Sequence, residues 1–285
     1  MNKSQLKRKI IIGSANFNQK YGKDSVKIKN LEIKKILNFS KKNKIYQIDT
    51  AESYLNKGSA FKNISKIYKF STKVTPSNDW LSLEFCQKKL DDHFENLNTN
   101  KIDTLFFHDI KILYSRNGIK IFNNLEKLKK KYFNKIGVSI YDTDCLNYIT
   151  QNYNFDIVQC PYNILNKSFL TTGWFEKLKK KDIEIHIRSI FLQGLLVNKS
   201  IYKKKYFKKW KKKIYDWFVY LNNNHISPID YCMSDLLYLD FDKVIIGINN
   251  YQNLKEILNF KKIDKNKFIN LHINDKRLID PRNWK

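Results

Sequence analysis

The chain has 285 residues, of which 42% are hydrophobic and 14% aromatic, and 54 basic against 27 acidic residues give it a formal net charge of +27. This apolar content is enough for a sizeable core, and no apolar run is long enough to span a bilayer. With only four prolines and eight glycines and no linker-like stretch, we expect one domain over residues 1–285.

The first residues, MNKSQLKRKIIIG, place basic side chains before three isoleucines. A secretory signal needs about 7–15 apolar residues, so this run is too short and we predict that it forms the first strand. The cysteines have neither CxxC nor zinc-ligand spacing, which predicts reduced thiols, no disulfide framework and no metal site. They are Cys86, Cys145, Cys160 and Cys232. Together these features predict a cytoplasmic protein.

Short apolar or β-branched runs recur along the chain, each followed by a stretch with helical periodicity. The predicted strands are 9–14, 46–49, 69–74, 104–108, 135–139, 156–160, 184–190 and 243–248. The periodicity is clearest at 82–97 and 122–133, and two helices are expected before the eighth strand, at 201–222 and 227–239. Eight strand–helix units in about 250 residues predict an α/β fold, the (β/α)8 TIM barrel. A doubly wound open sheet also alternates, but no strand precedes a GxGxxG or a P-loop.

The densest basic stretch, residues 201–222, interleaves lysines with aromatic residues, as single-strand nucleic-acid binders do. Its apolar residues recur at steps of four, which predicts an amphipathic helix packed on the core. These residues are Tyr202, Tyr206, Trp210, Ile214 and Phe218, with Phe207, Trp217 and Leu221 beside them. The other lysines are scattered, so we attribute the charge to composition and expect no specific nucleic-acid partner. A polyanion-binding protein stays an alternative that rests on the charge alone.

In such a barrel the chemistry takes place at the C-terminal ends of the strands. Polar residues end most of the predicted strands: Asp49, Lys73, His108, Ser139, Gln159 and Arg188, with Tyr54 just beyond the second strand. Each has an ordinary structural interpretation alone. Asp49 could cap a helix, Tyr54 could pack in the core, Lys73 could be exposed, and His108 could be a satisfied core histidine. Adjacent strands can bring these four together, which favours a shared site.

The ordered motifs IDTAESY, STKV, IDTLFFHD, IGVSIYD, VQCPYN and VIIGINNYQNLKEIL resemble those of the aldo-keto reductases, NAD(P)H-dependent carbonyl reductases on a (β/α)8 barrel. The likeness covers nearly the whole chain. The segments GSANFNQKYG, IHIRSIFLQGLL and LIDPRNW are similar to a bacterial branch associated with surface-polysaccharide and sugar-derivative biosynthesis. The resemblance implies reduction of an aldehyde or ketone, and the likeness to that branch implies that this carbonyl belongs to a sugar or sugar derivative.

The resemblance carries the family's catalytic tetrad onto Asp49, Tyr54, Lys73 and His108. Hydride attack on a carbonyl carbon leaves negative charge on the oxygen, which needs a proton. A free tyrosine has a pKa of about 10, and a nearby lysine ammonium strengthens it as an acid. Asp49 favours the protonated form of Lys73, and His108 can hydrogen-bond the carbonyl oxygen.

For the cofactor, the resemblance places Ser139 and Gln159 on the nicotinamide carboxamide, although Ile140 stands where many members have asparagine. Arg188 aligns with a tyrosine that stacks on the nicotinamide. A guanidinium can also stack on a ring, and its positive charge would favour the reduced cofactor. Leu55 replaces a common glycine after the catalytic tyrosine.

At the eighth strand, the positions that hold basic residues in members with strong NADPH preference are Gly247 and Asn253 here, and Glu256 matches an adenine contact. Asn249, with Asn250 and Gln252, offers only hydrogen bonds, and Lys255 is the nearest cation. NADP(H) is expected over NAD(H), with NAD(H) left open. The chain ends soon after DPRNW, so the long C-terminal loop of many relatives is not expected and the pocket is expected to be open.

Three other functions stay open. A Schiff-base lyase would use Lys73 as its nucleophile, which requires a lowered pKa that Asp49 opposes. A cofactor-sensing subunit on the same fold would bind the dinucleotide without turnover. The polyanion-binding protein is the third. The expected partner is a small-molecule carbonyl substrate, and neither the oligomeric state nor the direction of reaction follows from the sequence.

Overall fold

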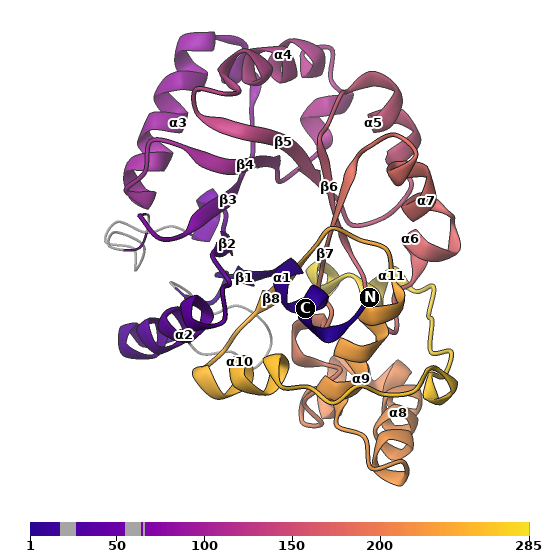
Figure 1. Ribbon diagram of the computed structural model, residues 1–285. Helices are drawn as coiled ribbons and strands as arrows, with labels where there is room; N and C mark the ends of the chain where they lie inside the picture. Colours follow the sequence, from indigo (N-terminus) through magenta and orange to yellow (C-terminus); the bar gives the residue numbers. More distant parts are fainter. Residues whose placement is uncertain (18–26, 55–63, 65, 285) are drawn as a thin grey trace.

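The computed structural model describes residues 1–17, 27–54, 64 and 66–284. Eight parallel strands follow one another around a closed barrel, and β8 pairs with β1 (Figure 1). The strands are β1 (Ile10–Gly13), β2 (Gln47–Asp49), β3 (Lys69–Val74), β4 (Ile102–Phe107), β5 (Phe133–Ser139), β6 (Ile157–Pro161), β7 (Glu184–Arg188) and β8 (Lys243–Gly247). All eight predicted strands and the predicted (β/α)8 barrel are confirmed.

Helices lie around the outside of this barrel (Figure 1). The α-helices are α1 (Lys3–Lys9), α2 (Asn30–Lys42), α3 (Leu83–Leu97), α4 (Gly118–Leu128), α5 (Leu146–Asn152), α6 (Ser168–Thr171), α7 (Trp174–Lys179), α8 (Lys211–Asn223), α9 (Pro228–Asp235), α10 (Tyr251–Leu258) and α11 (Lys276–Ile279). The 3-10 helices are η1 (Glu52–Tyr54), η2 (Asn78–Leu81), η3 (Lys111–Tyr114), η4 (Leu192–Gly194), η5 (Ile201–Lys203), η6 (Lys205–Trp210), η7 (Leu236–Tyr238), η8 (Lys265–Lys267) and η9 (Pro281–Asn283). Across the described residues, no helix is both long and apolar enough to cross a membrane.

Helix α3 shows how the local sequence sets an element. The Ser82 hydroxyl accepts a hydrogen bond from the Phe85 N–H at 3.2 Å, which caps the start of the helix. Apolar residues such as Cys86 and Leu90 recur every three or four positions and are fully buried. Asn98 ends the helix in the left-handed region, with φ of 52°, a conformation that asparagine tolerates better than most residues. The predicted helix at 82–97 is therefore confirmed almost to the residue.

Three predicted boundaries were wrong. The helix expected at 122–133 is α4, which starts earlier and ends at Leu128, because the chain turns there and Phe133 already pairs with Ile102 in the barrel. The continuous helix expected at 201–222 is an α-helix only from Lys211 onward. Before it, η5 and η6 are separated by Lys204, whose extended backbone (ψ of 148°) interrupts helical hydrogen bonding. Finally, the basic residues before the first strand form the short helix α1.

The apolar side of this 201–222 stretch packs as expected. Trp217 is 1% exposed and donates its indole N–H to the Leu196 carbonyl at 3.1 Å. It belongs to a second apolar cluster, outside the barrel core, that α8, α9 and the C-terminal residues share. Trp284 joins this cluster edge-on against Phe207, with 4.8 Å between ring centroids. The last described residues are thereby anchored to the barrel.

Large side chains fill the inside of the barrel. Phe106 on β4 pairs in register with Gly137 on β5, and a Cβ at Gly137 would lie 2.5 Å from the Phe106 ring. Only glycine therefore leaves room for that ring. Across the barrel, Phe106 lies 6.0 Å from His186 between ring centroids. Polar side chains also occur inside the barrel near the start of β7, where His186 lies 3.4 Å from the Glu184 carboxylate.

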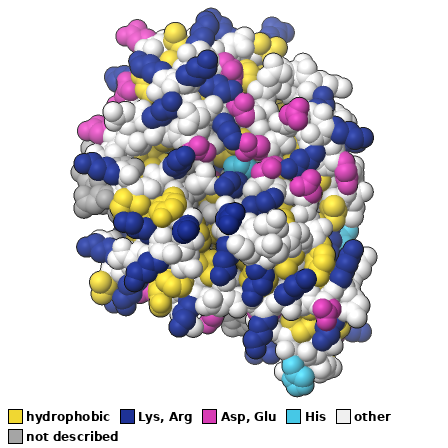
Figure 2. All heavy atoms as spheres, in the orientation of Figure 1, with side chains coloured by type: hydrophobic (Ala, Val, Ile, Leu, Met, Phe, Trp, Pro, Cys, Tyr) yellow, Lys and Arg dark blue, Asp and Glu magenta, His cyan; other side chains and the backbone are white. Residues whose placement is uncertain are grey.

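The positive charge is spread over the surface. Figure 2 shows lysine and arginine side chains dispersed across one face, with acidic side chains between them. A nucleic-acid footprint is expected to gather basic residues on one face or stripe. This face gives no support to the polyanion-binding alternative.

Candidate active site

A buried ion pair lies where β2 and β3 end. Asp49 is the last residue of β2, and its carboxylate Oδ1 accepts a hydrogen bond from the Lys73 ammonium of β3. Lys73 also donates to the Thr50 carbonyl oxygen at 3.1 Å. Asp49 and Lys73 are only 5% and 4% exposed. The exposed position considered for Lys73 is therefore wrong, and Asp49 pairs with a strand neighbour instead of capping a helix.

The amide of Gln159 extends this network across the barrel. Its Nε2 donates to the second carboxylate oxygen of Asp49 at 2.9 Å. Its Oε1 accepts from the Ser139 hydroxyl at 3.3 Å. Gln159 is fully buried on β6 and Ser139 ends β5. Four strands thus contribute side chains to one connected polar cluster.

The remaining two predicted catalytic residues lie next to each other. His108 follows β4 directly, and its backbone N–H donates to the Val74 carbonyl of β3 at 2.8 Å. The Tyr54 ring on η1 meets the His108 ring edge to face, with 6.3 Å between centroids. Since η1 also packs against β3, Tyr54 lies on the same side of the barrel as Lys73. The structure therefore gathers all four predicted residues at one end of the barrel.

Burial changes the protonation behaviour of this group. Burial, together with the positive charges of Lys73 and Arg188, lowers the pKa of His108 from 6.5 to about 4, so its imidazole is neutral at pH 7. Burial also lowers the pKa of Lys73, while the Asp49 carboxylate opposes that shift. Desolvation is the larger effect on Lys73, and the Asp49 carboxylate acts in the expected direction, toward the protonated form.

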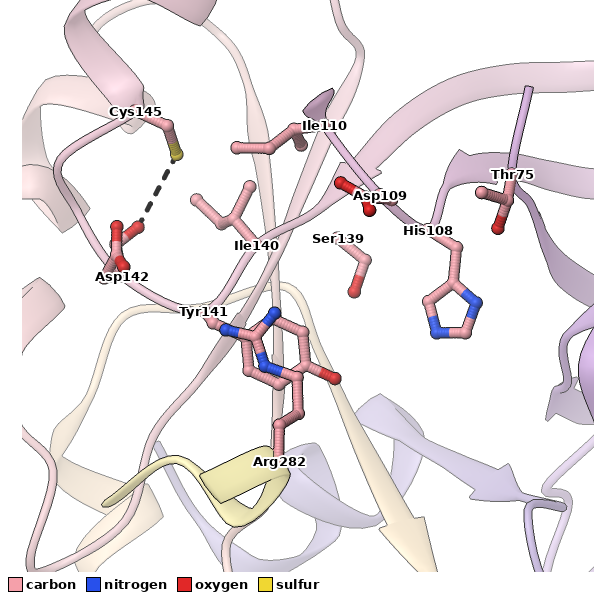
Figure 3. A pocket seen from close by; sticks show the side chains of 10 residues that line it. All are labelled: Thr75, His108, Asp109, Ile110, Ser139, Ile140, Tyr141, Asp142, Cys145 and Arg282. Atoms are coloured by element: carbon pink, nitrogen blue, oxygen red, sulfur yellow. Dashed lines mark hydrogen bonds between the residues drawn. The ribbon is translucent and has the colours of Figure 1, made fainter. Parts of the chain in front are cut away.

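A cavity of about 310 Å³ opens beside His108 and Ser139 (Figure 3). Its walls also carry the polar or charged side chains of Thr75, Asp109, Asp142 and Arg282, and the apolar side chains of Ile110 and Ile140, with Tyr141 and Cys145. A pocket of this size suits a small molecule. Burial raises the pKa of the Cys145 thiol to about 12, so it is not a reactive thiolate at neutral pH.

Arg188 ends β7 and lies behind this wall. Its guanidinium carbon lies 4.1 Å from the centre of the Tyr141 ring, and Nη2 donates to the Ile140 carbonyl at 3.0 Å. Tyr141 is thus the ring on which Arg188 stacks in this structure. Arg282 lies over the same ring, with its guanidinium carbon 3.4 Å from the ring centre.

The residues expected at the adenosine end of the dinucleotide lie together around the end of β8. Gly247 ends the strand, and a Cβ there would meet nothing within 4 Å, so the space beside it is open. Asn249 accepts a hydrogen bond from Asn16 Nδ2 at 2.6 Å. Asn253 lies in the first turn of α10, where its N–H is capped by Asn250, and Glu256 follows one turn later.

Two buried oxygens test whether this region suits a dinucleotide. Asn16 Oδ1 and Thr50 Oγ1 have no hydrogen-bond partner among the described residues. Buried polar atoms are nearly always paired, so such atoms suit a hydroxyl- or amide-bearing ligand. At the start of α10 the helix dipole is already met by the Glu32 carboxylate, which accepts the Tyr251 N–H at 2.6 Å. Asn16 and Thr50 fit a nicotinamide dinucleotide, while the predicted carboxamide contacts of Ser139 and Gln159 stay a prediction.

Several cavity residues were not identified from the sequence. Thr75, Asp109 and Tyr141 each follow a strand by one or two residues, so counting further past the strand ends would have found them. Arg282 lies in the DPRNW motif, which carries the family likeness, but its place in the cavity follows only from the fold. From η9, Arg282 reaches the cavity wall (Figure 3), and the expectation of an open pocket stays a prediction. Leu55 lies outside the described residues.

A closed parallel barrel with buried polar chemistry at the C-terminal ends of its strands defines the class of (β/α)8 enzymes. The sequence profile of the Aldo/keto reductase family matches residues 9–270, so the chain belongs to that family. Membership makes it an oxidoreductase of carbonyl compounds.

Solved structures of aldo-keto reductases and related enzymes share this fold. An aldo-keto reductase from Bacillus halodurans, in its holo form, superposes with a TM-score of 0.71 at 15% identity, over 91% of this chain and 89% of that one. A glycerol dehydrogenase from Gluconobacter oxydans gives a TM-score of 0.63 at 13% identity, over 96% and 92% of the two chains. A search of curated protein sequences found no significant match. At these identities the structures establish the shared fold alone.

Proposed function

We propose that the protein reduces an aldehyde or ketone to the alcohol by hydride transfer from NAD(P)H, with Tyr54 as the general acid. One observation carries this proposal: the buried Asp49–Lys73 ion pair ends at the same barrel mouth as His108, which lies edge to face with Tyr54. Together they supply an acid, a cation to strengthen it and a hydrogen-bond donor.

Each side chain has a separate role in this proposal. A bound reduced nicotinamide supplies the hydride. The Tyr54 hydroxyl gives its proton to the carbonyl oxygen, and the positive charge of Lys73 stabilises the tyrosinate left behind. Asp49 holds Lys73 in place and favours its charged form. Neutral His108 donates one N–H to the carbonyl oxygen and orients it without competing as an acid.

The cofactor is proposed to be NADP(H), by resemblance, with NAD(H) as the alternative. Ser139 and Gln159 would hold the carboxamide, Arg188 would lie beside the nicotinamide ring, and the residues around α10 would hold the adenosine end. One contact weighs against a 2′-phosphate: the Glu32 carboxylate accepts the Tyr251 N–H at 2.6 Å, at the first turn of α10. A negative charge there favours NADH, and fluorescence titrations with both reduced dinucleotides would rank them.

The substrate is proposed to be a sugar or sugar-derived carbonyl compound, as in polysaccharide biosynthesis. The resemblance of the GSANFNQKYG, IHIRSIFLQGLL and LIDPRNW segments supports this proposal. The cavity adds support, because its wall combines hydroxyl, carboxylate and guanidinium groups with one aromatic ring. These are the groups that bind sugar hydroxyls.

The test combines binding with turnover. Wild type is expected to oxidise NADPH or NADH in the presence of some members of an aldehyde panel that includes sugar aldehydes. Tyr54→Phe should lower kcat by at least about a hundredfold, the range of general acid catalysis, while the cofactor Kd changes little. Cofactor binding without turnover of any aldehyde would identify a cofactor-sensing subunit instead. Turnover that survives in Tyr54→Phe would reject Tyr54 as the acid.

A Schiff-base lyase is the second candidate, because burial lowers the pKa of Lys73 and a neutral amine is the nucleophile in that chemistry. Against it, Lys73 already donates to Asp49 and Thr50 and is only 4% exposed. Borohydride treatment with candidate carbonyl compounds decides between the two. A stable mass increase on wild type that Lys73→Met abolishes would favour the lyase.

A further inference from the structure

The C-terminal segment brings a cation to the wall of the catalytic cavity. Arg282 on η9 lines the same cavity as His108, and its guanidinium lies over the Tyr141 ring (Figure 3). Asp280 fixes its direction by accepting hydrogen bonds from Nε at 3.0 Å and from Nη2 at 2.6 Å. Nη1 donates to no residue in the described part of the chain, so one end of the guanidinium remains for a ligand.

A second guanidinium lies on the same ring. Arg188 is half-buried, and its carbon is 4.1 Å from the Tyr141 ring centre. Its hydrogen bonds go to neutral acceptors, the Ile140 carbonyl at 3.0 Å and the Ser189 hydroxyl at 3.3 Å. No carboxylate among the described residues comes within ion-pair distance of it. Two like charges on one ring repel each other, and an unpaired half-buried charge is costly to desolvate.

The carboxylates of the cavity wall have cations of their own. Asp142 pairs with Lys276 at 3.1 Å, and Asp109 lies 3.8 Å from Lys111. Asp280 forms its ion pair with Arg282. Arg188 therefore differs from the other charged side chains named around Tyr141, because its positive charge has no ion-pair partner among the described residues. Its field also reaches the catalytic group, where it helps to lower the pKa values of His108 and Lys73.

We propose that the Arg282 guanidinium on the cavity wall forms an anion subsite, with Arg188 adding its positive charge from behind the Tyr141 ring, and that the substrate carries a carboxylate or phosphate in addition to its carbonyl. This inference rests on the proposed function, because the carbonyl is placed at Tyr54 and His108. Guanidinium groups bind carboxylate and phosphate oxygens through paired N–H donors. A cavity of about 310 Å³ accommodates a short chain between the two groups.

The test uses pairs of aldehydes that differ only in the anion. Glyceraldehyde 3-phosphate is compared with glyceraldehyde, and 4-carboxybenzaldehyde with benzaldehyde, so that the phosphate and carboxylate pairs distinguish the two anions. In wild type the anionic member of at least one pair is expected to have a tenfold or greater advantage in kcat/KM. Arg282→Gln should reduce that advantage at least tenfold, and Arg282→Lys should restore part of it. Arg8→Gln is the control. This substitution removes the same charge, and Arg8 is exposed on α1 at the opposite end of the barrel.

A binding measurement keeps the inference separate from the proposed function. Calorimetric titration of 4-(hydroxymethyl)benzoate and of glycerol 3-phosphate onto wild type should show at least one of them binding tenfold more weakly to Arg282→Gln than to wild type or Arg8→Gln. If wild type reduces no aldehyde but this difference holds, the proposed function fails and the anion subsite stands. Equal kcat/KM within both aldehyde pairs, or equal binding to wild type and Arg282→Gln, would overturn the subsite. If Arg282 had a purely structural role, Arg282→Gln would lower kcat/KM equally for the anionic and the neutral aldehyde of a pair.

Discussion

The Asp49–Lys73 ion pair makes the clearest stability prediction. Replacing Lys73 by methionine keeps the length of the side chain but removes its ammonium. Asp49, which is only 5% exposed, then has no cation beside it. That carboxylate keeps one partner, the Gln159 amide at 2.9 Å. Breaking a buried pair from one side costs about 3–5 kcal/mol, because the remaining charge is uncompensated. The Gln159 hydrogen bond places the expected loss near 3 kcal/mol, or more than a hundredfold in the folding equilibrium.

The double variant Asp49→Asn/Lys73→Met separates stability from catalysis. It removes both charges, and replacing a whole buried pair is often neutral, so its free energy of unfolding should return to within about 1 kcal/mol of wild type. Its carbonyl reductase activity should stay as low as that of Lys73→Met, since Tyr54 still lacks a neighbouring cation. Urea denaturation followed by far-UV circular dichroism measures the first quantity, and cofactor oxidation measures the second.

The matched control is Lys135→Met. Lys135 pairs with Glu184, and these side chains are 38% and 36% exposed, so the loss should be at most about 1 kcal/mol. An equal loss of stability in Lys73→Met and Lys135→Met would show that burial of the Asp49–Lys73 pair does not matter. A double variant as unstable as Lys73→Met would show that the buried unpaired charge is not the cause.

Two further predictions concern stability away from the ion pair. Burial lowers the pKa of His93 from 6.5 to about 4, so the unfolded chain binds more protons than the folded one between these values, and stability falls as the pH drops from 6.5 to 4. This histidine should contribute on the order of 3 kcal/mol to that fall, and His93→Gln, which keeps a partner for Thr72, should flatten the profile in urea titrations at each pH. Trp284→Ala should cost about 3–5 kcal/mol, because the ring is 6% exposed and packs on Phe207. It should also raise KM, since Arg282 lies two residues away; an unchanged KM in a destabilised variant would contradict that link.

The barrel could be predicted from local patterns along the chain. Alternating β-branched runs and helical periodicity are local properties, and eight such units leave a closed parallel sheet as the simplest way to bury them. The polar residues at the strand ends could be predicted in the same way. The end of each strand follows from the local pattern, and in a parallel barrel all strands end at the same mouth. Asp49, Lys73, His108, Ser139 and Gln159 were found in this way.

The helix boundaries needed more than periodicity. Helix α4 ends at Leu128 because Phe133 is required by the barrel, and the 201–210 segment breaks at Lys204 although its apolar spacing continues. Spacing alone reports which side of a segment is buried. It does not report where the backbone hydrogen bonds change, since packing against distant elements sets that point.

The charge state and the shape of the site depend on how distant parts of the chain pack together. The sequence showed Asp49 beside Lys73 but not that both would be nearly inaccessible, and burial, more than the carboxylate, governs the pKa of Lys73. Likewise, Arg188 and Arg282 are 94 residues apart in the chain (282 − 188), and no local pattern joins them. They meet on Tyr141 because β7 ends where the C-terminal segment crosses the mouth, a contact that the fold alone provides.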